Sequence, residues 1–593
     1  MSKTKANQHP DQGALPRPNG RAIRPGQPRQ SVQARLPDGR IFEAPPGTPL
    51  AEIVCAASRP GDPTVVAAII NNKLAELTTP LSRDADVRPV TVAESDGTRI
   101  YRRSLVFLLA AAARELYPQA ELFVEHAAAT AGAYFCEVHG RPPFTQAELD
   151  SLQARMRQIV ADDQPFVKSQ APLAEAIELF RARGEDDKVR LLAHRQKDTL
   201  VLYRLNGYAD YLQGYMLPST GYLRTFSLQA FPPGFLLQFP HQDSPDDLTP
   251  YAPYPRLFAV FEEYSHWLSR LGIRGAGALN DAIASGRLAE VSLVAEALHE
   301  GRLARIAADI AAQRDHLRIV LIAGPSSSGK TTFAKLLAIQ LLANGLHPFP
   351  LALDDYFVDR DLTPRDANGQ FDYETIRALD VALFNHDLLD LMAGRPAQLP
   401  LYNFVTGMRG PGQTITLGAD DILIVEGIHG LNPELVPDLP PESVYRVYVS
   451  ALTQLNLDRH NRVSTTDTRL IRRLVRDAAT RGYTAAQTLA RWESVKRGEK
   501  LYIFPYQENS DAIFNSALVH EMAVLRPLAE PLLLQVRYDT PQYVEANRLL
   551  SFLQWFRPAL AAPVPDNSIL REFIGPHPTM LDTWSWQSLR VKD

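Results

Sequence analysis

Cysteine is scarce in this 593-residue chain, which contains only Cys55 and Cys136. Two thiols rule out a disulfide framework and argue against a cysteine-ligated metal cluster. Long apolar runs are also missing, and the N-terminus lacks a signal-peptide apolar core, so we expect a cytoplasmic protein without membrane contact. Neither charge dominates: a net charge of -5 argues against a broad surface for nucleic acid or lipid.

The length is too great for a single core and predicts three or four domains. Hydrophobic residues make up 45% of the chain and charged residues 22%, which is an ordinary globular balance. The first segment, 1–30, is different, because it holds six Lys or Arg residues and five prolines but few large apolar residues. It predicts a disordered basic tail. A solvated leader and an arm that contacts nucleic acid are the two interpretations of this tail.

The most informative stretch is LIAGPSSSGKTT, from Leu321 to Thr332. A short apolar run precedes it and apolar residues at helical spacing follow, so the pattern predicts strand, glycine loop and helix. Such a loop turns its backbone N–H groups around a triphosphate. Lys330 is suited to the β- and γ-phosphates and the Thr331 hydroxyl to Mg²⁺. The predicted ATP-binding residues here are Gly324, Pro325, Ser326, Ser327, Ser328, Gly329, Lys330, Thr331 and Thr332.

Two further apolar runs end in carboxylates. Phe349 to Leu353 leads into Asp354, and Ile422 to Val425 closes on Glu426. Carboxylates at the carboxyl ends of parallel strands lie where such sheets bind ligands. We therefore interpret Asp354 as a base for an attacking hydroxyl, or alternatively as an ordinary helix cap. Glu426 is interpreted as the metal-linked acid of a Walker B element, acting with Thr331.

A basic helix is predicted from Thr468 to Tyr483. Arg469, Arg472, Arg473 and Arg476 share one helix face, and four like charges repel unless an anion meets them. We expect a lid in which Arg472, Arg473 and Arg476 close on ATP phosphates. The alternative is a solvated helix whose arginines pair with Asp467 and Asp477.

These motifs, in this order, are similar to those of the uridine kinase / phosphoribulokinase family of P-loop kinases. The family's base matches Asp354, its F-D motif matches Phe371-Asp372, and its lid matches Arg472 to Gly482. Its Y-x-[FY]-V segment matches Tyr402 to Val405, followed by Arg409. The resemblance implies Mg²⁺-dependent transfer of the γ-phosphate of ATP to a hydroxyl, with the 5′-hydroxyl of uridine or cytidine as the leading acceptor. It implies acceptor contacts from Asp372, Tyr402, Phe404, Arg409 and Tyr483.

Two positions depart from the nucleoside kinases. Gly407 stands where they carry a histidine, and Tyr483 stands where they carry an arginine. Loss of two polar contacts alters which acceptor is accepted. The parts for phosphoryl transfer are complete, so a kinase of a small hydroxyl compound is the better supported expectation.

The front of the chain resembles threonyl-tRNA synthetases. Residues 31–96 predict a hairpin around Pro37-Asp38-Gly39, a short helix and a strand from Val65 to Ile70, an order similar to the TGS domain. Residues 97–243 resemble the synthetase's editing domain. The family's four catalytic positions read Arg103, Phe107, Leu212 and Met216, so the resemblance implies a domain that cannot deacylate. Binding and purely structural roles both stay open.

The sequence therefore predicts a multidomain α/β protein. It consists of a β-grasp domain, an α+β domain, a helical linker over 244–315, a P-loop domain with a parallel sheet over 316–540, and a helix with an extension over 541–593. Within that extension, VPDNSILREFIG suggests packing against another domain. One alternative function is an RNA- or nucleotide-sensing binder that uses the P-loop as an ATP switch. Another is a sugar-phosphate kinase of phosphoribulokinase type, which needs more basic residues near Tyr402 to Arg409. RNA contact through the front half and homo-oligomer formation stay open.

Overall fold

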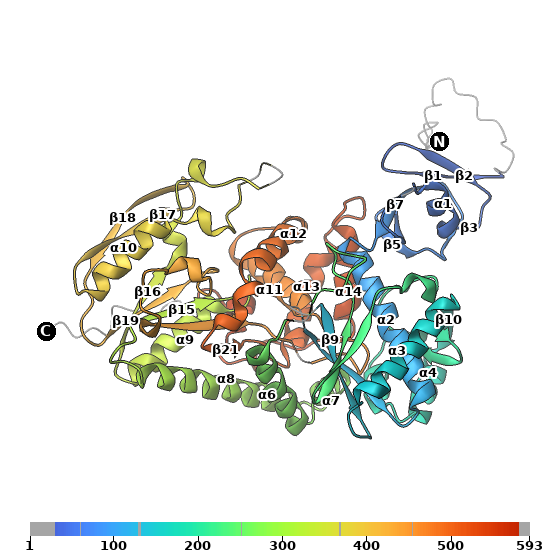
Figure 1. Ribbon diagram of the computed structural model, residues 1–593, viewed down its shortest axis with the longest axis horizontal. Helices are drawn as coiled ribbons and strands as arrows, with labels where there is room; N and C mark the ends of the chain where they lie inside the picture. Colours follow the sequence, from blue (N-terminus) through green and yellow to red (C-terminus); the bar gives the residue numbers. More distant parts are fainter. Residues whose placement is uncertain are drawn as a thin grey trace, which may run out of the picture.

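The computed structural model describes residues 30–59, 61–128, 132–250, 252–366, 369, 371–453, 455–579 and 581. The predicted tail, apart from its last residue, lies outside these ranges. The parallel sheet and the front half occupy opposite ends of the molecule, and the small N-terminal sheet stands at one corner (Figure 1). None of the described helices is both long and apolar enough to cross a membrane.

The N-terminal unit is a five-stranded sheet in the order β2-β1-β7-β4-β5, with one helix packed on it. The predicted hairpin is present as the antiparallel pair β1–β2, and Gly39 in its turn has a φ of +85°. Leu50, Ile53 and Val54 on the helix are buried against the sheet. The elements are β1 Val32–Arg35, β2 Ile41–Ala44, β3 Thr48–Pro49, α1 Leu50–Ala57, β4 Val65–Ile70, β5 Lys73–Glu76, β6 Pro80–Leu81 and β7 Ala85–Thr91.

The second unit holds an antiparallel four-stranded sheet, in the order β13-β14-β9-β8, and a three-stranded one, β10-β11-β12. Its long first helix, α2, is alanine-rich and is buried without a break from Ser104 to Ala113. Phe107, Leu212 and Met216 pack into one apolar cluster with it, so three of the four editing-type positions form core. The elements are α2 Ser95–Leu116, β8 Glu121–Ala128, β9 Ala133–His139, α3 Gln146–Ala161, β10 Val167–Pro172, α4 Leu173–Ala182, α5 Asp186–Ala193, β11 Thr199–Leu205, β12 Tyr208–Asp210, β13 Ser227–Phe231 and β14 Gly234–Gln238.

Three helices follow the second unit: α6 Pro255–Leu271, α7 Ala276–Ala284 and α8 Leu288–Ala311. All three lie within the helical linker predicted over 244–315. Helix α8 packs against α9 (Lys330–Ala343) of the kinase-like region and runs along one side of the molecule (Figure 1).

The C-terminal region is built on a wholly parallel five-stranded sheet in the order β16-β19-β15-β20-β21. Helices flank the sheet, and a hairpin, β17–β18, projects from it on the α10 side (Figure 1). Its central strand, β15, is completely buried. The elements are β15 Ile319–Ala323, α9 Lys330–Ala343, β16 His347–Ala352, α10 Val381–Met392, β17 Ala397–Asn403, β18 Met408–Ile415, β19 Asp421–Glu426, β20 Val444–Ser450, α11 Thr465–Thr480, α12 Ala485–Tyr502, β21 Ala512–Asn515, α13 Glu521–Leu534, α14 Tyr543–Leu553 and α15 Arg571–Ile574.

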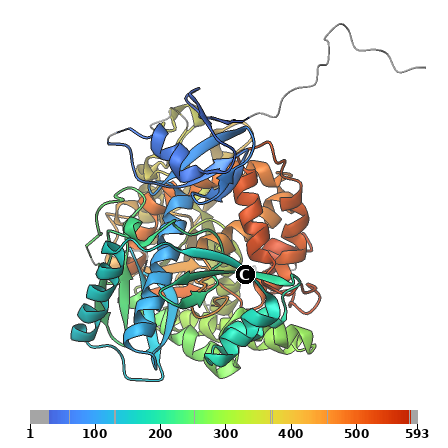
Figure 2. The same ribbon diagram turned by 90° about the vertical axis from the view of Figure 1, so that its right-hand side faces the viewer.

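Polar contacts join the front half to the kinase-like region. Lys188 is fully buried and donates to both carboxylate oxygens of Asp210, and the His460 ring lies 2.7 Å from that carboxylate. A second link runs from Arg99 on α2 through Glu545 to Arg548 on α14. In the perpendicular view the front half lies in front of the kinase-like region (Figure 2). These contacts make the front half part of the framework that supports the candidate site.

Candidate active site

The predicted glycine loop lies at the carboxyl end of β15, and α9 begins at Lys330. A Cβ added to Gly324 would lie 1.9 Å from the carbonyl oxygen of Val449, so no side chain fits there. Ser327 and Gly329 have φ values of +58° and +86°. These left-handed residues curl the loop, and the N-terminus of α9 adds partial positive charge beside it. The backbone thus has the form that phosphate binding needs.

Thr331 and Glu426, the two residues predicted to hold a metal ion, are in contact. Strand β19 lies next to β15, and the Thr331 Oγ1 donates to the Glu426 Oε2 at 3.0 Å. Burial raises the pKa of the Glu426 carboxyl, while Lys330 and the Thr331 hydroxyl act against that rise. One hydroxyl and one carboxylate fit Mg²⁺, which keeps several of its waters.

Asp354 lies at the same edge of the sheet, one strand further along. It belongs to a short 3₁₀ turn, Leu353–Tyr356, directly after β16, and Ala352 pairs with Glu426 in register. Its side chain is exposed to solvent, but desolvation by the surrounding protein still raises its pKa and Lys330 opposes the rise. The N-cap position of this turn is Ala352, so Asp354 does not cap it.

Arg472 differs from the expectation of a phosphate contact. It is fully buried, its Nε donates to Glu521 at 2.7 Å, and it also donates to the Ser516 carbonyl oxygen at 2.7 Å. The Ser516 hydroxyl in turn donates to the carbonyl oxygen of Ser328 in the glycine loop. The Arg472 guanidinium thus links α11 to Glu521 and to Ser516, and through Ser516 to the glycine loop.

Arg473 and Arg476 lie nearer the loop. Arg473 donates to the Ser326 hydroxyl at 2.8 Å, and both arginines contact Asp477, at 3.2 Å and 3.1 Å. The pairing with Asp477 that was one alternative for this helix is therefore present. Asp467 instead pairs with Arg548. Helix α11, which carries the predicted lid arginines, therefore packs against the glycine loop, called the phosphate loop below.

Two glutamates that contact the glycine loop or the start of α9 were not predicted from the sequence. Glu499 on α12 accepts the Ser326 backbone N–H at 2.9 Å and pairs with both guanidinium nitrogens of Arg469. Glu572 on α15 accepts the Thr332 hydroxyl at 2.7 Å and lies 3.8 Å from Arg476. Both come from segments distant in sequence, and the unexplained stretch that contains Glu572 gave the only signal.

The predicted packing of the C-terminal extension is confirmed for its described residues. Ile569 and Phe573 are buried, and a Cβ on Gly329 would lie 2.6 Å from the Ile569 Cγ2. Phe573 also stacks under the Arg472 guanidinium at 4.9 Å. The extension therefore covers one side of the phosphate loop.

The predicted acceptor residues lie on several elements. Asp372 accepts the Glu374 N–H at 3.1 Å and the Tyr502 hydroxyl at 3.3 Å. Tyr402 is buried and packs against Phe404, which is 59% exposed and thus free to meet a ligand. Arg409 donates to Asp380 at 2.9 Å. Tyr483 follows α11, and its ring lies under the Arg491 guanidinium.

Gly407, one of the two departures from the nucleoside kinases, adjoins an unexpected arginine. It has a φ of +73°, and an added Cβ would lie 2.6 Å from the Arg360 Nε. Arg360 also donates to the Phe404 carbonyl oxygen at 2.7 Å. The space that a side chain would take at 407 is thus filled by a guanidinium from a separate segment, which the motif alone could not indicate.

Comparison with known proteins finds similarity for two parts of the chain. Residues 319–523 match the model of the Phosphoribulokinase / Uridine kinase family. The N-terminal part is similar to threonine–tRNA ligases, for example that of Xanthomonas euvesicatoria pv. vesicatoria (27% identical over 201 residues). That match covers 33% of this chain and 31% of the ligase, so the chain spans about a third of the length of these curated relatives. The ligase of Desulforamulus reducens is 28% identical over 200 residues, with 34% and 31% covered.

Two solved structures are similar to smaller parts of the chain. One, described as a possible uridine kinase from Bacillus stearothermophilus, is 21% identical with a TM-score of 0.23 and covers 33% of this chain and 88% of its own. The D-glycerate 3-kinase from Cryptococcus neoformans var. grubii is 15% identical with a TM-score of 0.19, covering 42% and 87%. Residues 319–523 are thus similar to the Phosphoribulokinase / Uridine kinase family, and the part before them is similar to threonine–tRNA ligases.

Proposed function

We propose that this protein transfers the γ-phosphate of ATP to a hydroxyl of a small acceptor, with a nucleoside 5′-hydroxyl as the first candidate. One observation carries the proposal. Lys330, Thr331, Glu426 and Asp354 converge at the carboxyl edge of one parallel sheet, where the Thr331–Glu426 contact has already formed at 3.0 Å. A binding switch needs the first three residues, but it does not need a carboxylate in the place of a base.

Each residue has one task in this proposal. Lys330 and the N-terminus of α9 hold the phosphates, and Thr331 and Glu426 would hold Mg²⁺, which neutralises phosphate charge when bound. Asp354 orients the acceptor hydroxyl and takes its proton. Arg473 and Arg476 balance charge that develops during transfer, whereas Arg472 supports the loop through Ser516.

The acceptor side consists of Asp372, Tyr402, Phe404 and Arg409, and Tyr483 borders the lid. The exposed Phe404 ring beside buried Tyr402 offers an aromatic face to a planar base or an apolar edge of a sugar. The proposed test is ATP consumption by the purified protein with uridine, cytidine, the purine nucleosides, ribulose 5-phosphate, or no acceptor. Turnover that depends on one acceptor supports the proposal. Tight ATP binding without any such turnover contradicts it.

A second acceptor class is favoured by Arg360. This side chain lies against Gly407 and the Phe404 carbonyl oxygen, so two arginines, Arg360 and Arg409, flank the hairpin residues. A paired guanidinium group is suited to a phosphate or carboxylate on the acceptor. Turnover with ribulose 5-phosphate but with no nucleoside would favour this class.

The front half has a supporting role in this proposal. It resembles a TGS domain followed by an editing-type domain whose catalytic positions are filled by Arg103, Phe107, Leu212 and Met216. Lys188 and Asp210 of the front half bond to each other, and Asp210 contacts His460 in the loop before α11. In this proposal these contacts stabilise the loop that leads to the lid arginines. RNA contact is tested by adding RNA to the ATP assay without an acceptor: stimulation would favour the RNA-sensing function.

A further inference from the structure

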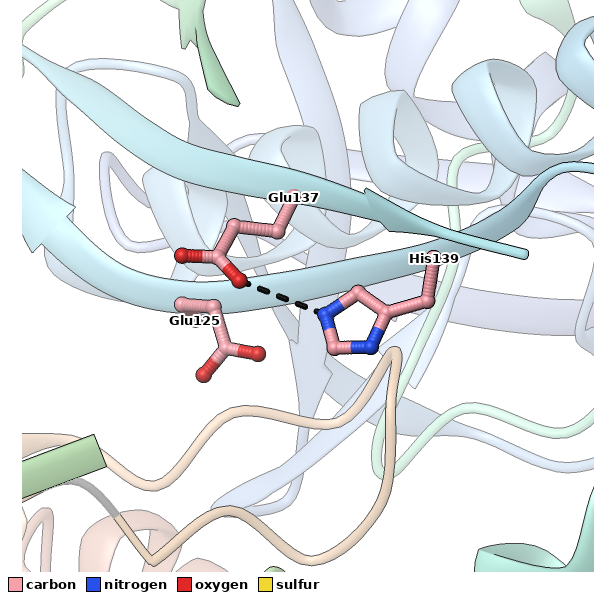
Figure 3. Close-up of side chains that lie close together, drawn as sticks. All are labelled: Glu125, Glu137 and His139. Atoms are coloured by element: carbon pink, nitrogen blue, oxygen red, sulfur yellow. Dashed lines mark hydrogen bonds and ion pairs between the residues drawn. The ribbon is translucent and has the colours of Figure 1, made fainter. Parts of the chain in front are cut away.

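Two glutamates and a histidine gather on the antiparallel sheet of the second unit, away from the phosphate loop. Glu137 and His139 project from the same face of β9, and Glu125 lies across from them on β8 (Figure 3). One ligand atom from each residue lies within 4.8 Å of the other two. The His139 Nε2 is 3.2 Å from the Glu137 Oε2. This spacing suits a shared metal ion, whose bonds to oxygen and nitrogen are about 2.0–2.2 Å.

The strand geometry fixes this arrangement. Strand β8 has an irregularity between Val124 and His126, and such bulges redirect side chains next to functional sites. The Asn456 amide donates to the carbonyl oxygens of Val124 and Glu125 at 3.0 Å and 2.9 Å. The backbone of Glu125 is thus held from the kinase region, while its carboxylate accepts no hydrogen bond that the described residues show.

A separate observation also indicates a missing polar ligand. His126 is only 4% exposed, and its Nε2 has no hydrogen-bond partner in the described structure. It borders the same small cavity as Glu125 and Glu137, where Phe261 stacks on its ring at 4.0 Å. A buried ring nitrogen without a partner is costly, and a water on a metal ion would satisfy it.

The cluster opens on a larger space. A cavity of about 420 Å³ is lined by Glu125, Glu137 and His139 together with α6–α7 residues and the loop from Asn456 to Arg459. Its basic residues are largely occupied, since Arg459 pairs with Asp187 and Arg190 with Asp281. Arg274, the third arginine on the wall, donates to Ser269. Glu125, Glu137 and His139 are all partly exposed, so solvent and ions can reach the cluster.

We propose that Glu125, Glu137 and His139 bind a divalent transition-metal ion, Zn²⁺ or Mn²⁺, at the junction of the second unit and the kinase region. Two carboxylates and one imidazole form a mixed oxygen–nitrogen set with open coordination positions. Mg²⁺ is less suited because it prefers oxygen ligands. The site is distinct from the editing-type positions, three of which are core residues, and from Thr331 and Glu426.

Such an ion would stiffen the junction. The ion would link β8 to β9. At the same point β8 is already bonded to the kinase region, through Asn456 and through the Val124 N–H, which donates to the Arg459 carbonyl oxygen at 2.8 Å. The same loop continues into α11, which carries the lid arginines. The proposal does not depend on kinase activity.

The test is titration of Zn²⁺ and Mn²⁺ into the full, chelator-stripped chain without nucleotide, by calorimetry and, for Mn²⁺, by electron paramagnetic resonance. We compare the wild type with Glu137→Gln/His139→Asn, and with Glu178→Gln as a control in an exposed ion pair with Arg181. We expect one ion per chain for the wild type and the control, and affinity about 100-fold weaker or worse in the double variant. Circular dichroism in chelator checks that the double variant is folded.

Three results would overturn the proposal. The wild type would bind no ion, the double variant would bind as tightly as the wild type, or Thr331→Ala would lose the ion while the double variant kept it. The last result would place the ion in the phosphate loop. Hydrogen exchange adds a local readout, since the ion should slow exchange in residues 121–128 in the wild type but not in the double variant.

Discussion

Glu499→Gln is the sharpest test of how the phosphate loop is held. Glu499 and Arg469 are 2% and 1% exposed and form a two-pronged ion pair, and the same carboxylate accepts the Ser326 backbone N–H at 2.9 Å. Glutamine keeps the shape of glutamate but carries no charge. Arg469 would keep its bond to the Ser326 carbonyl oxygen at 3.0 Å and its place 5.6 Å from the Trp492 ring, but it would lose its counterion.

The size of the effect follows from burial. Removing one partner of a buried ion pair costs about 3–5 kcal/mol, since the other charge remains in a medium of low dielectric constant. The pair joins α11 to the phosphate loop, so its loss should lower the free energy of local opening there. Local opening of the loop and of α11 should therefore become at least about a hundredfold more frequent. We also expect the KM for ATP to rise, because Ser326 loses its fixed position.

The assay is native-state hydrogen exchange at the Ser326 amide and along α11, which measures local opening free energies. The matched control is Arg469→Met/Glu499→Leu, which removes both charges and should recover most of the lost stability. Opening free energies for Glu499→Gln within about 1 kcal/mol of the wild type would refute the reasoning, because exposed pairs contribute no more than that.

Three further predictions follow from the site. Glu572→Gln should lower the KM for ATP roughly fivefold, since it removes a carboxylate that occupies Thr332 and lies near Arg476, and steady-state kinetics checks this; an unchanged or higher KM would contradict it. Burial, followed by the charge of Glu499, raises the pKa of Glu374 from an ordinary 4.5 to about 7. Ionisation of Glu374 should therefore lower the free energy of unfolding as the pH rises from about 4.5 to about 7, with no further change above pH 7. Thermal unfolding from pH 5 to 8 should therefore show Glu374→Gln increasingly more stable than the wild type up to pH 7, and a constant difference would be inconsistent with the shift. Arg360→Met should raise the KM for an anionic acceptor by about tenfold or more while the KM for ATP stays constant; equal KM values for the acceptor would remove Arg360 from the acceptor side.

Much of the framework could be predicted from the sequence because its signals are local. The strand before Gly324, the helix after Lys330 and the carboxylates that end β16 and β19 all follow from short apolar runs and their punctuation. Parallel pairing then brings Thr331 and Glu426 together, since both lie at the carboxyl edge of neighbouring strands.

The partners of the charged residues could not be predicted in this way. The helical spacing correctly placed Arg472 and Arg473 on one face of α11. The residues that contact this face come from α12, α13 and α15, which are distant in sequence. Arg472 therefore contacts Glu521, at the start of a helix beyond the lid, where a phosphate contact was expected. Position 407 is similar, because its glycine signalled a lost contact while Arg360 fills the space from another segment.

The central claim is that Asp354 serves as the base in phosphoryl transfer. The most direct measurement is transfer of labelled γ-phosphate from ATP to the best acceptor, by the wild type and by Asp354→Asn, with ATP affinity measured in parallel. We predict that Asp354→Asn lowers kcat by about 10²–10⁴-fold while ATP still binds, because only the proton acceptor is lost. Near-normal kcat in this variant, with the acceptor still phosphorylated, would contradict the account.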